Sequence, residues 1–329
     1  MVILFFSMRR DGKSLGQMAR DEIGPVGGAA ALIAVFSIMI ILLAVLALVV
    51  VNALRDSPWG LFTLSMTIPI ALLMGWWMNA VRPGKVVEAT VIGIALLMVA
   101  LVGGQWVSQS PTWGPAFTWW GENLSWAIMV YGFIASVLPV WLLLAPRDYL
   151  SAFMKIGTIV LLGVAIIVVL PPLRMPAVTQ FIDGSGPVFA GKLFPFAFIT
   201  IACGAVSGFH ALISSGTSPK MVRCEPDARL VGYGSMLTES LVGVMAMVAA
   251  ATLDPGVYFA MNVGPATLGA NAASASQAIA QWGFTVSPQQ LESLASQMGE
   301  STLLSRTGGA PSLAVGMAGI LGNVFSGPG

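Results

Sequence analysis

Long apolar runs separated by short polar segments dominate this sequence. A helix needs about 20 apolar residues to cross the hydrocarbon core of a bilayer, and the clearest run has no charged residue between Glu22 and Arg55. Seven runs are long enough, and they lie at residues 27–54, 61–81, 86–107, 124–144, 155–172, 193–214 and 230–253. The pattern predicts an all-α integral membrane protein with about seven transmembrane helices.

Composition favours this membrane class over a soluble protein with buried helices. Hydrophobic residues make up 57% of the chain and charged residues only 9%, against about 25% charged residues in soluble domains. The net charge of +1 gives no reason to expect a nucleic-acid partner. Two cysteines, Cys203 and Cys224, and a single histidine provide neither a disulfide framework nor a set of metal ligands. We therefore expect no metal and no cofactor.

No catalytic motif is complete in the sequence. "DGKSLG" contains Gly12, Lys13 and Ser14 but lacks the first glycine of a phosphate-binding loop. "GAVSG" has its serine one place too late for the nucleophile turn of a serine hydrolase. An intramembrane enzyme would need a full catalytic set, so we expect that the protein is not an enzyme.

The lysines and arginines predict the orientation of the chain in the membrane, because cytoplasmic loops carry the excess of these residues. Eleven lie on one side of the predicted spans and four on the other. The cytoplasmic side would then contain residues 9–22, 82–85, 145–155 and 219–229. Arg147 and Asp148 lie on the short turn 145–155, where we expect an ion pair.

Residues 254–308 form an extracytoplasmic loop on this prediction, and part of it should be helical. In "SPQQLESLASQM", Ser287 is placed to cap a helix, Pro288 to begin it and Gln290 to complete a capping box. Leu291, Leu294, Ala295 and Met298 would then share one apolar face. A structural cap on the spans is the favoured interpretation, and a lid over a substrate path is the alternative.

Both ends of the sequence contain short apolar segments, "MVILFFSM" and "GGAPSLAVGMAGILGNVFSGPG". Neither reads as a complete span with its own flanking loops. We expect residues 1–329 to be one transmembrane domain, truncated at both ends, from a longer protein. The N- and C-terminal helices of that longer protein would then be its partners in the membrane.

The segment "CGAVSGFHALISSGTSPKM" combines polar residues with signs of a helix break. On a helix, Ser207, His210, Ser214 and Thr217 are spaced three, four and three residues apart, so they would form one polar stripe. Such a stripe beside a break is typical of substrate sites in secondary transporters. We therefore predict that these four residues line a substrate or ion pathway.

Glycines and a proline in the same segment carry the prediction of close packing and of the break. Gly204 and Gly208 would let a neighbouring helix approach. Gly216 and Pro219 make continuation of the helix unfavourable. The alternative is an ordinary packing seam in which His210 is only hydrogen-bonded.

Glu239 lies near the middle of the last predicted span, in "VGYGSMLTESLVGVMAMVAAATL". An ionisable residue at that depth costs about 3 kcal/mol unless it is neutralised or paired. It should face the interior of the bundle, and we predict that it carries a proton. A structural hydrogen bond to a neighbouring helix is the alternative.

Several long motifs resemble the carbon starvation protein A family across essentially the whole chain. They are "RRDGKSLGQMARDEIGPVGG", "SPWGLFTL", "LPVWLLLAPRDYL", "ACGAVSGFHALISSGTSPK" and "RTGGAPSLAVG". The resemblance implies a multi-pass carrier of the bacterial inner membrane that takes up peptides or pyruvate during carbon starvation, by symport with protons. It also implies a transporter core of inverted repeats and broken helices.

The expected partners are a proton, a small-molecule substrate such as a peptide or small carboxylate, and the lipid bilayer. The alternative function is a membrane sensor or signalling subunit that responds to nutrient limitation. A sensor would need an output domain, and these residues contain none.

Overall fold

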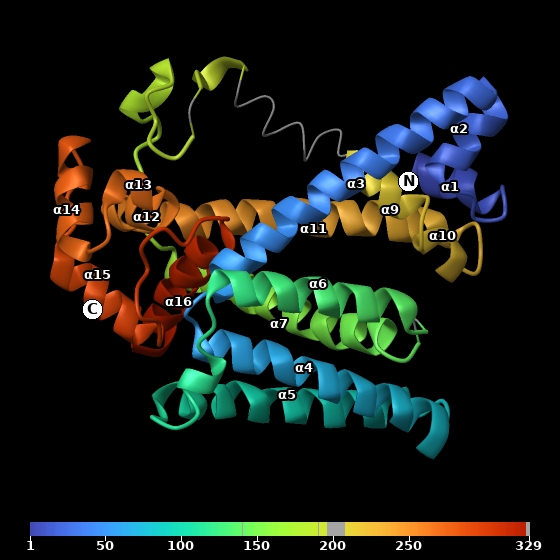
Figure 1. The fold of residues 1–329 in the computed structure, drawn as a ribbon, viewed down its shortest axis with the longest axis horizontal. Helices are drawn as coiled ribbons and strands as arrows, with labels where there is room; N and C mark the ends of the chain where they lie inside the picture. Colours follow the sequence, from blue (N-terminus) through green and yellow to red (C-terminus); the bar gives the residue numbers. More distant parts are fainter. Residues whose placement is uncertain (140, 190, 196–207, 327–329) are drawn as a thin grey trace. The chain divides into compact units, whose positions relative to one another are not determined.

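The computed structural model describes residues 1–139, 141–189, 191–195 and 208–326 (Figure 1). The described residues form helices and turns, with no strand among them. They divide into two compact units, Met1–Leu46 with Pro176–Met247 and Ala47–Met175 with Val248–Gly329, here called unit 1 and unit 2.

Five helices in the described part of the chain are long and apolar enough to cross a membrane. They are α3 (Pro25–Leu54), α4 (Pro58–Trp76) with its π-helical continuation η1 (Trp77–Val81), α5 (Val86–Gln109), α7 (Leu144–Val169) and α11 (Asp227–Ala251). The predicted class, an all-α multi-pass membrane protein, is confirmed.

Two of the seven predicted spans differ from the structure. Helix α7 begins at Leu144 and not near residue 155, so the predicted turn 145–155 is wrong. Pro146 falls in the first turn of α7, where a missing backbone N–H breaks no hydrogen bond. Helix α6 (Gly121–Val137) ends early because Pro139 cannot continue a helix, and its 17 residues fall short of a full span.

The predicted span 193–214 lies mostly outside the described residues, because residues 196–207 are not described. Its C-terminal end forms α9 (Gly208–Ser214), and α10 (Ser218–Met221) follows after a turn.

Unit 1 contains α9 and α10 together with α1 (Val2–Met8), α2 (Leu15–Ile23) and η3 (Gln180–Asp183). Helix α1 contacts α2, α9 and α10. Ser14 caps α2 through a capping box with Gln17. Exposed ion pairs in this region join Arg9 to Glu225, Arg10 to Glu22 and Lys13 to Asp21.

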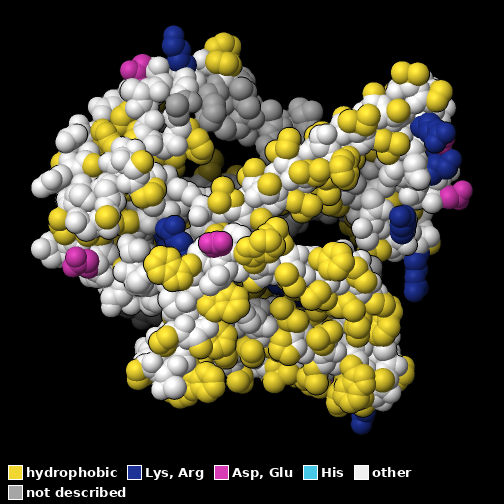
Figure 2. Space-filling model, in the orientation of Figure 1, with side chains coloured by type: hydrophobic (Ala, Val, Ile, Leu, Met, Phe, Trp, Pro, Cys, Tyr) yellow, Lys and Arg dark blue, Asp and Glu magenta, His cyan; other side chains and the backbone are white. Residues whose placement is uncertain are grey.

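The core of unit 2 lies where α4 contacts both α5 and α7. Ile70 and Met74 of α4, Leu97 and Ala100 of α5 and Leu150 of α7 are buried against one another. Figure 2 shows apolar side chains over the outer surface of these helices and of α6. Exposed residues such as Trp76, Val99, Phe133 and Ile167 belong to that surface. An apolar surface of this kind suits contact with lipid.

Unit 2 also contains short helices. They are η2 (Pro115–Phe117), α12 (Pro255–Asn262), α13 (Pro265–Leu268), α14 (Ala272–Gln281), α15 (Pro288–Gln297) and α16 (Ala310–Ser326). Among them, α12 contacts α14 and α16, and η2 contacts α4. The ring of Phe259 lies 4.9 Å from that of Phe284 and 5.9 Å from that of Trp282.

Helix α15 begins as the sequence predicts. The Ser287 hydroxyl accepts the backbone N–H of Gln290 at 3.1 Å, and Pro288 occupies the first turn. The return bond from the Gln290 side chain, which would complete a capping box, is absent from the described hydrogen bonds. Leu291 and Ala295 are buried, which confirms the predicted apolar face.

Candidate functional site

The polar segment around the histidine is interrupted by a turn. Helix α9 ends at Ser214, residues 215–217 form the turn, and α10 begins at Ser218 with Pro219 in its first turn. Thr217 therefore lies beyond α9, on the other side of Gly216 from His210 and Ser214. Gly208 begins α9, whereas Gly204 and Ser207 lie outside the described residues.

Local hydrogen bonds satisfy several hydroxyls of this segment. The Ser214 hydroxyl donates to the Ala211 carbonyl at 3.2 Å, and Thr217 is exposed. Ser215, which the sequence analysis did not select, is the buried member of the group. Its hydroxyl accepts the Leu15 backbone N–H at 3.2 Å, so it ties the start of α2 to the end of α9.

His210 and Glu239, predicted separately from the sequence, lie in contact within unit 1. The Nε2 atom of His210 in α9 is 3.1 Å from Oε2 of Glu239 in α11. Their side chains are 51% and 61% exposed. Glu239 stands at the midpoint of the 25-residue α11. An imidazole and a carboxyl at this distance can share a proton, because both change charge by one proton.

The hydroxyls that flank Glu239 on α11 are turned back to their own helix. Ser235, Thr238 and Ser240 each donate to the carbonyl four residues earlier, at 2.6 to 2.9 Å. These hydroxyls are therefore bonded within α11, whereas the Glu239 carboxylate contacts His210 of α9.

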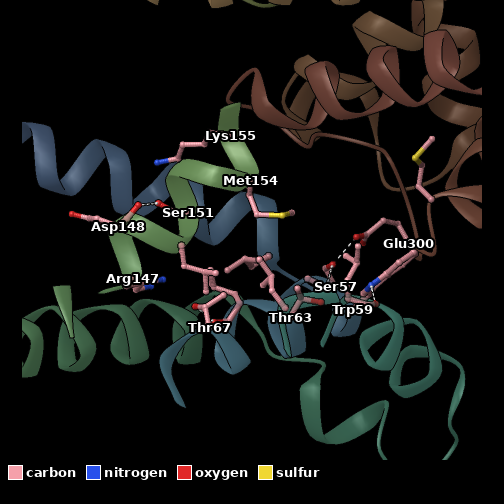
Figure 3. Close-up of a pocket in the computed structure, with 17 residues that line it drawn as sticks. Ser57, Trp59, Thr63, Thr67, Arg147, Asp148, Ser151, Met154, Lys155 and Glu300 are labelled. Carbon is pink, nitrogen blue, oxygen red and sulfur yellow. Dashed lines mark hydrogen bonds between the residues drawn. The ribbon is translucent and has the colours of Figure 1, made fainter. Parts of the chain in front are cut away.

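Unit 2 contains a cavity of about 690 Å³ lined by α4, α5 and α7 and by residues that follow α15 (Figure 3). Leu64, Leu97, Leu101, Leu150 and Met154 give its wall apolar surface. Thr63 and Thr67 lie between two groups of polar side chains at the ends. One end contains Ser57 and Glu300, and the other contains Arg147, Asp148, Ser151 and Lys155.

Arg147 is fixed by a residue of α6. Its Nη1 atom donates to the hydroxyl of Tyr131, and its guanidinium carbon lies 4.8 Å from the centre of the Tyr131 ring. The expected Arg147–Asp148 ion pair is not among the ion pairs of the described residues, so this prediction is wrong. Neighbours on one helix turn point apart, and the aromatic ring draws Arg147 to α6.

Glu300 lies at the opposite end of the cavity in a buried hydrogen-bond cluster. Its carboxylate accepts the Ser57 hydroxyl at 2.6 Å and Nη2 of Arg306 at 2.9 Å. Burial raises the pKa of Glu300, and the nearby Asp56 also raises it, while the bonds from Ser57 and Arg306 lower it. The net direction is upward because desolvation is the largest of these effects.

Arg306 completes this cluster and holds the turn between α3 and α4. It is only 4% exposed, and besides Glu300 it donates to three backbone carbonyls. These belong to Arg55 at 2.6 Å, Thr302 at 3.2 Å and Ala53 at 3.3 Å. A cation at the C-terminal end of α3 also suits the helix dipole.

The sequence analysis did not select Arg147, Glu300 or Arg306 as site residues. Arg147 was assigned to a turn, and Glu300 and Arg306 to an outer loop. A signal was present for Arg147, since a charged pair follows directly on the apolar run "LPVWLLLAP". No spacing pattern indicates that residues 300 and 306 contact residues 53–57.

Comparison with known protein families identifies the family of the chain. The family model described as carbon starvation protein CstA matches residues 1–329. The chain belongs to this family. The predicted relationship is therefore confirmed. No solved structure matches the chain.

Curated members of the carbon starvation family are similar over nearly all of the chain. The peptide transporter CstA of Escherichia coli strain K12 is 56% identical in an alignment of 331 positions that covers 99% of this chain and 47% of that protein. The pyruvate/proton symporter BtsT of the same strain is 52% identical over 98% of this chain and 48% of its own length. The peptide transporter CstA of Mycobacterium tuberculosis strain H37Rv is 53% identical over the whole chain and 44% of its own length. The chain thus spans about half the length of the curated relatives it matches.

Proposed function

We propose that this chain takes part in proton-coupled uptake of peptides or pyruvate across the bacterial inner membrane during carbon starvation. The relatives are named as a peptide transporter and a pyruvate/proton symporter, which supports both the transported class and the coupling ion. Membrane-spanning helices and a 690 Å³ cavity suit a carrier. The activity proposed is transport and not catalysis.

The contact between His210 and Glu239 is the observation that carries the proposal of proton coupling. A proton-coupled carrier needs a group whose protonation differs between its inward- and outward-facing states. Glu239 lies halfway along a membrane-spanning helix, where the neutral carboxyl is favoured unless a partner holds the charge. His210, with Nε2 3.1 Å from the carboxylate, is such a partner, because an imidazole can carry a positive charge.

The turn at residues 215–217 supports including Ser214 and Thr217 in the proposed pathway, because they lie on either side of Gly216. A turn between two helices leaves backbone groups without helical partners, and these can bind a substrate or ion inside a carrier. We assign His210 and Glu239 to the proton and the hydroxyls of Ser207, Ser214 and Thr217 to the same pathway. Gly204, Gly208 and Pro219 would shape the surrounding packing and the break.

The test uses Glu239→Gln in the product of the complete gene. Glutamine keeps the shape of the side chain and can hydrogen-bond to His210, but it cannot titrate. Uptake of a labelled dipeptide and of labelled pyruvate is measured in cells with and without a proton uncoupler. The variant should lose accumulation against a gradient and keep exchange of labelled for unlabelled substrate.

Glu88→Gln is the matched control. Glu88 also lies on a membrane-spanning helix, but in the first turn of α5, where Arg82 pairs with it at 3.0 Å. The control should accumulate substrate normally. Accumulation by Glu239→Gln that still collapses with the uncoupler would remove Glu239 from the coupling role.

His210 is tested by His210→Ala alone and together with Glu239→Gln. Since the two side chains are in contact, their effects should not add, and the double variant should accumulate no less than Glu239→Gln alone. Abundance of each variant in the membrane is measured alongside. An equal loss of abundance and uptake in His210→Ala would indicate a packing role and contradict the proposal.

A further inference from the structure

We propose that the cavity between α4, α5 and α7 binds the carboxylate of an organic acid or peptide through Arg147, with Tyr131 as a positioning residue. This assignment rests on the proposed transport function and gives it a substrate site within unit 2, whereas the His210–Glu239 pair belongs to unit 1. Three observations on this cavity support it.

The first observation is that Arg147 is held in place with part of its guanidinium free. Tyr131 accepts a hydrogen bond from Nη1 and lies under the guanidinium. In the described part of the chain, Nε and Nη2 of Arg147 have no hydrogen-bond partner, and no carboxylate lies within 4.0 Å. Nε and Nη2 form the edge of the guanidinium that binds a carboxylate by two parallel hydrogen bonds. Because Tyr131 fixes the orientation of the guanidinium, less side-chain entropy is lost when a carboxylate binds.

The second observation is the place of Arg147 on a helix long and apolar enough to span a membrane. It lies in the first turn of α7 and lines the cavity together with Thr67 of α4 (Figure 3). A cation on such a helix is costly without a counter-ion. A bound carboxylate would supply that counter-ion.

The third observation concerns the wall between the two polar ends. Leu64, Leu97, Leu101 and Met154 offer contact to an apolar body attached to the carboxylate. A volume of 690 Å³ falls in the range of about 300 to 1,000 Å³ typical of pockets for drug-sized ligands. A di- or tripeptide therefore suits the cavity better than a three-carbon keto acid, which would leave most of it to water.

The experiment combines a variant of the arginine with a change in the ligand. Alanyl-leucine, its C-terminal amide and pyruvate are the probes, and each is measured as a competitor of dipeptide uptake and by direct binding to the purified product of the complete gene. Arg147→Lys keeps the charge but loses the two-point contact. We expect it to raise KM for alanyl-leucine about tenfold or more, with Vmax changed less than twofold.

The ligand amide identifies the contact. Wild-type protein should bind the amide about tenfold or more weakly than the acid, and this preference should be smaller in Arg147→Lys, which keeps the charge but loses the two-point contact. Arg82→Lys, an exposed arginine outside the cavity, is the control and should keep the wild-type preference. Direct binding of pyruvate without binding of alanyl-leucine would identify a keto acid, and direct binding of alanyl-leucine would identify a peptide, as the source of the carboxylate.

A further variant addresses the positioning role of Tyr131. Tyr131→Phe should raise KM several-fold and leave Vmax and membrane abundance unchanged, since it removes only the hydroxyl that positions Arg147.

The outcomes separate this assignment from the proposed function. If Arg147→Lys discriminates acid from amide as strongly as wild type, the cavity is not the carboxylate site, whatever the transport result. If wild type takes up neither probe in cells, the transport proposal fails, and the binding measurements still decide the assignment. If Arg147→Lys is not inserted in the membrane, unchanged dipeptide binding by Tyr131→Phe overturns it.

Discussion

Replacing Arg306 by methionine should destabilise unit 2 more than any change to an exposed ion pair. The substitution removes the donors to the carbonyls of Ala53, Arg55 and Thr302 and leaves Glu300 with Ser57 as its remaining described partner. The Arg306 and Glu300 side chains are 5% and 20% exposed, so solvent screens their interaction little. Breaking such a buried pair costs about 3 to 5 kcal/mol.

The assay is the melting temperature of the purified protein in detergent, followed by tryptophan fluorescence. At about 2 °C for each kcal/mol, Arg306→Met should melt roughly 6 to 10 °C below wild type. Arg82→Met is the matched control. Its ion pair with Glu88 has nearly the same length, 3.0 Å against 2.9 Å, but its side chains are 58% and 38% exposed. Exposed pairs contribute about 0 to 1 kcal/mol.

A double variant tests whether the cost comes from an unpaired buried charge. Arg306→Met with Glu300→Met removes both charges, and apolar replacement of a buried pair is often neutral. The double variant should recover at least half of the loss. A loss in Arg306→Met no larger than in Arg82→Met, or a double variant as unstable as the sum of the singles, would refute the reasoning.

Three further predictions follow from the described contacts. Gly316→Ala would place a methyl group 2.1 Å from the Ala249 carbonyl oxygen and should destabilise by about 1 to 3 kcal/mol, whereas Gly319→Ala, with open space, should be neutral or slightly stabilising in a melting assay. Ser287→Ala should cost about 1 kcal/mol through loss of the α15 cap, measured the same way. Because the folded-state pKa of Glu300 is raised, its stabilising contribution should be present below its ordinary pKa and be lost as pH rises through the folded-state value; Glu300→Gln should flatten that part of a stability-against-pH curve.

Apolar length alone predicted the long helices well. The run after Glu22 gave a predicted span of 27–54, and the helix is Pro25–Leu54. Nothing else in the sequence competes there, because no charged residue interrupts the run. The second span was predicted to end at residue 81, where η1 ends, because Arg82 stops the apolar pattern there. The early end of α6 before Pro139 could not be placed as closely, since the apolar pattern continues past it.

The prediction of a turn at residues 145–155 was wrong because charged residues occur there within a helix. Hydropathy assigns Arg147, Asp148 and Lys155 to a loop, because each is unfavourable in lipid. In the structure these residues belong to α7, where Arg147 meets Tyr131 and lines the cavity. Long charged side chains can bury their apolar stems and keep their polar ends on a partner. Hydropathy therefore predicts a loop where the chain is helical, because it does not include the contact that Arg147 makes with Tyr131.

The two sites differed in what the sequence could indicate. Glu239 was visible as a charge within an apolar run and His210 as the one histidine, although their contact needed the structure. The cavity of unit 2 depends on contacts between separate helices, and its polar residues have no shared spacing. Only an arrangement in space brings Ser57, Arg147 and Glu300 to the same cavity.

The hydrogen bonds from Arg306 to the α3–α4 turn have a consequence for the time course of synthesis. Arg55 and Arg306 are 251 residues apart in the chain. At 5 to 20 residues per second, the ribosome needs roughly 13 to 50 seconds to add the second after the first. During that interval the α3–α4 hairpin lies in the membrane without Arg306, and the carbonyls of Ala53 and Arg55 are exposed to water or lipid headgroups. The α3–α4 turn therefore forms before its hydrogen bonds to Arg306 can form. Until residue 306 emerges, the apolar helices α3 and α4 must hold the hairpin in place.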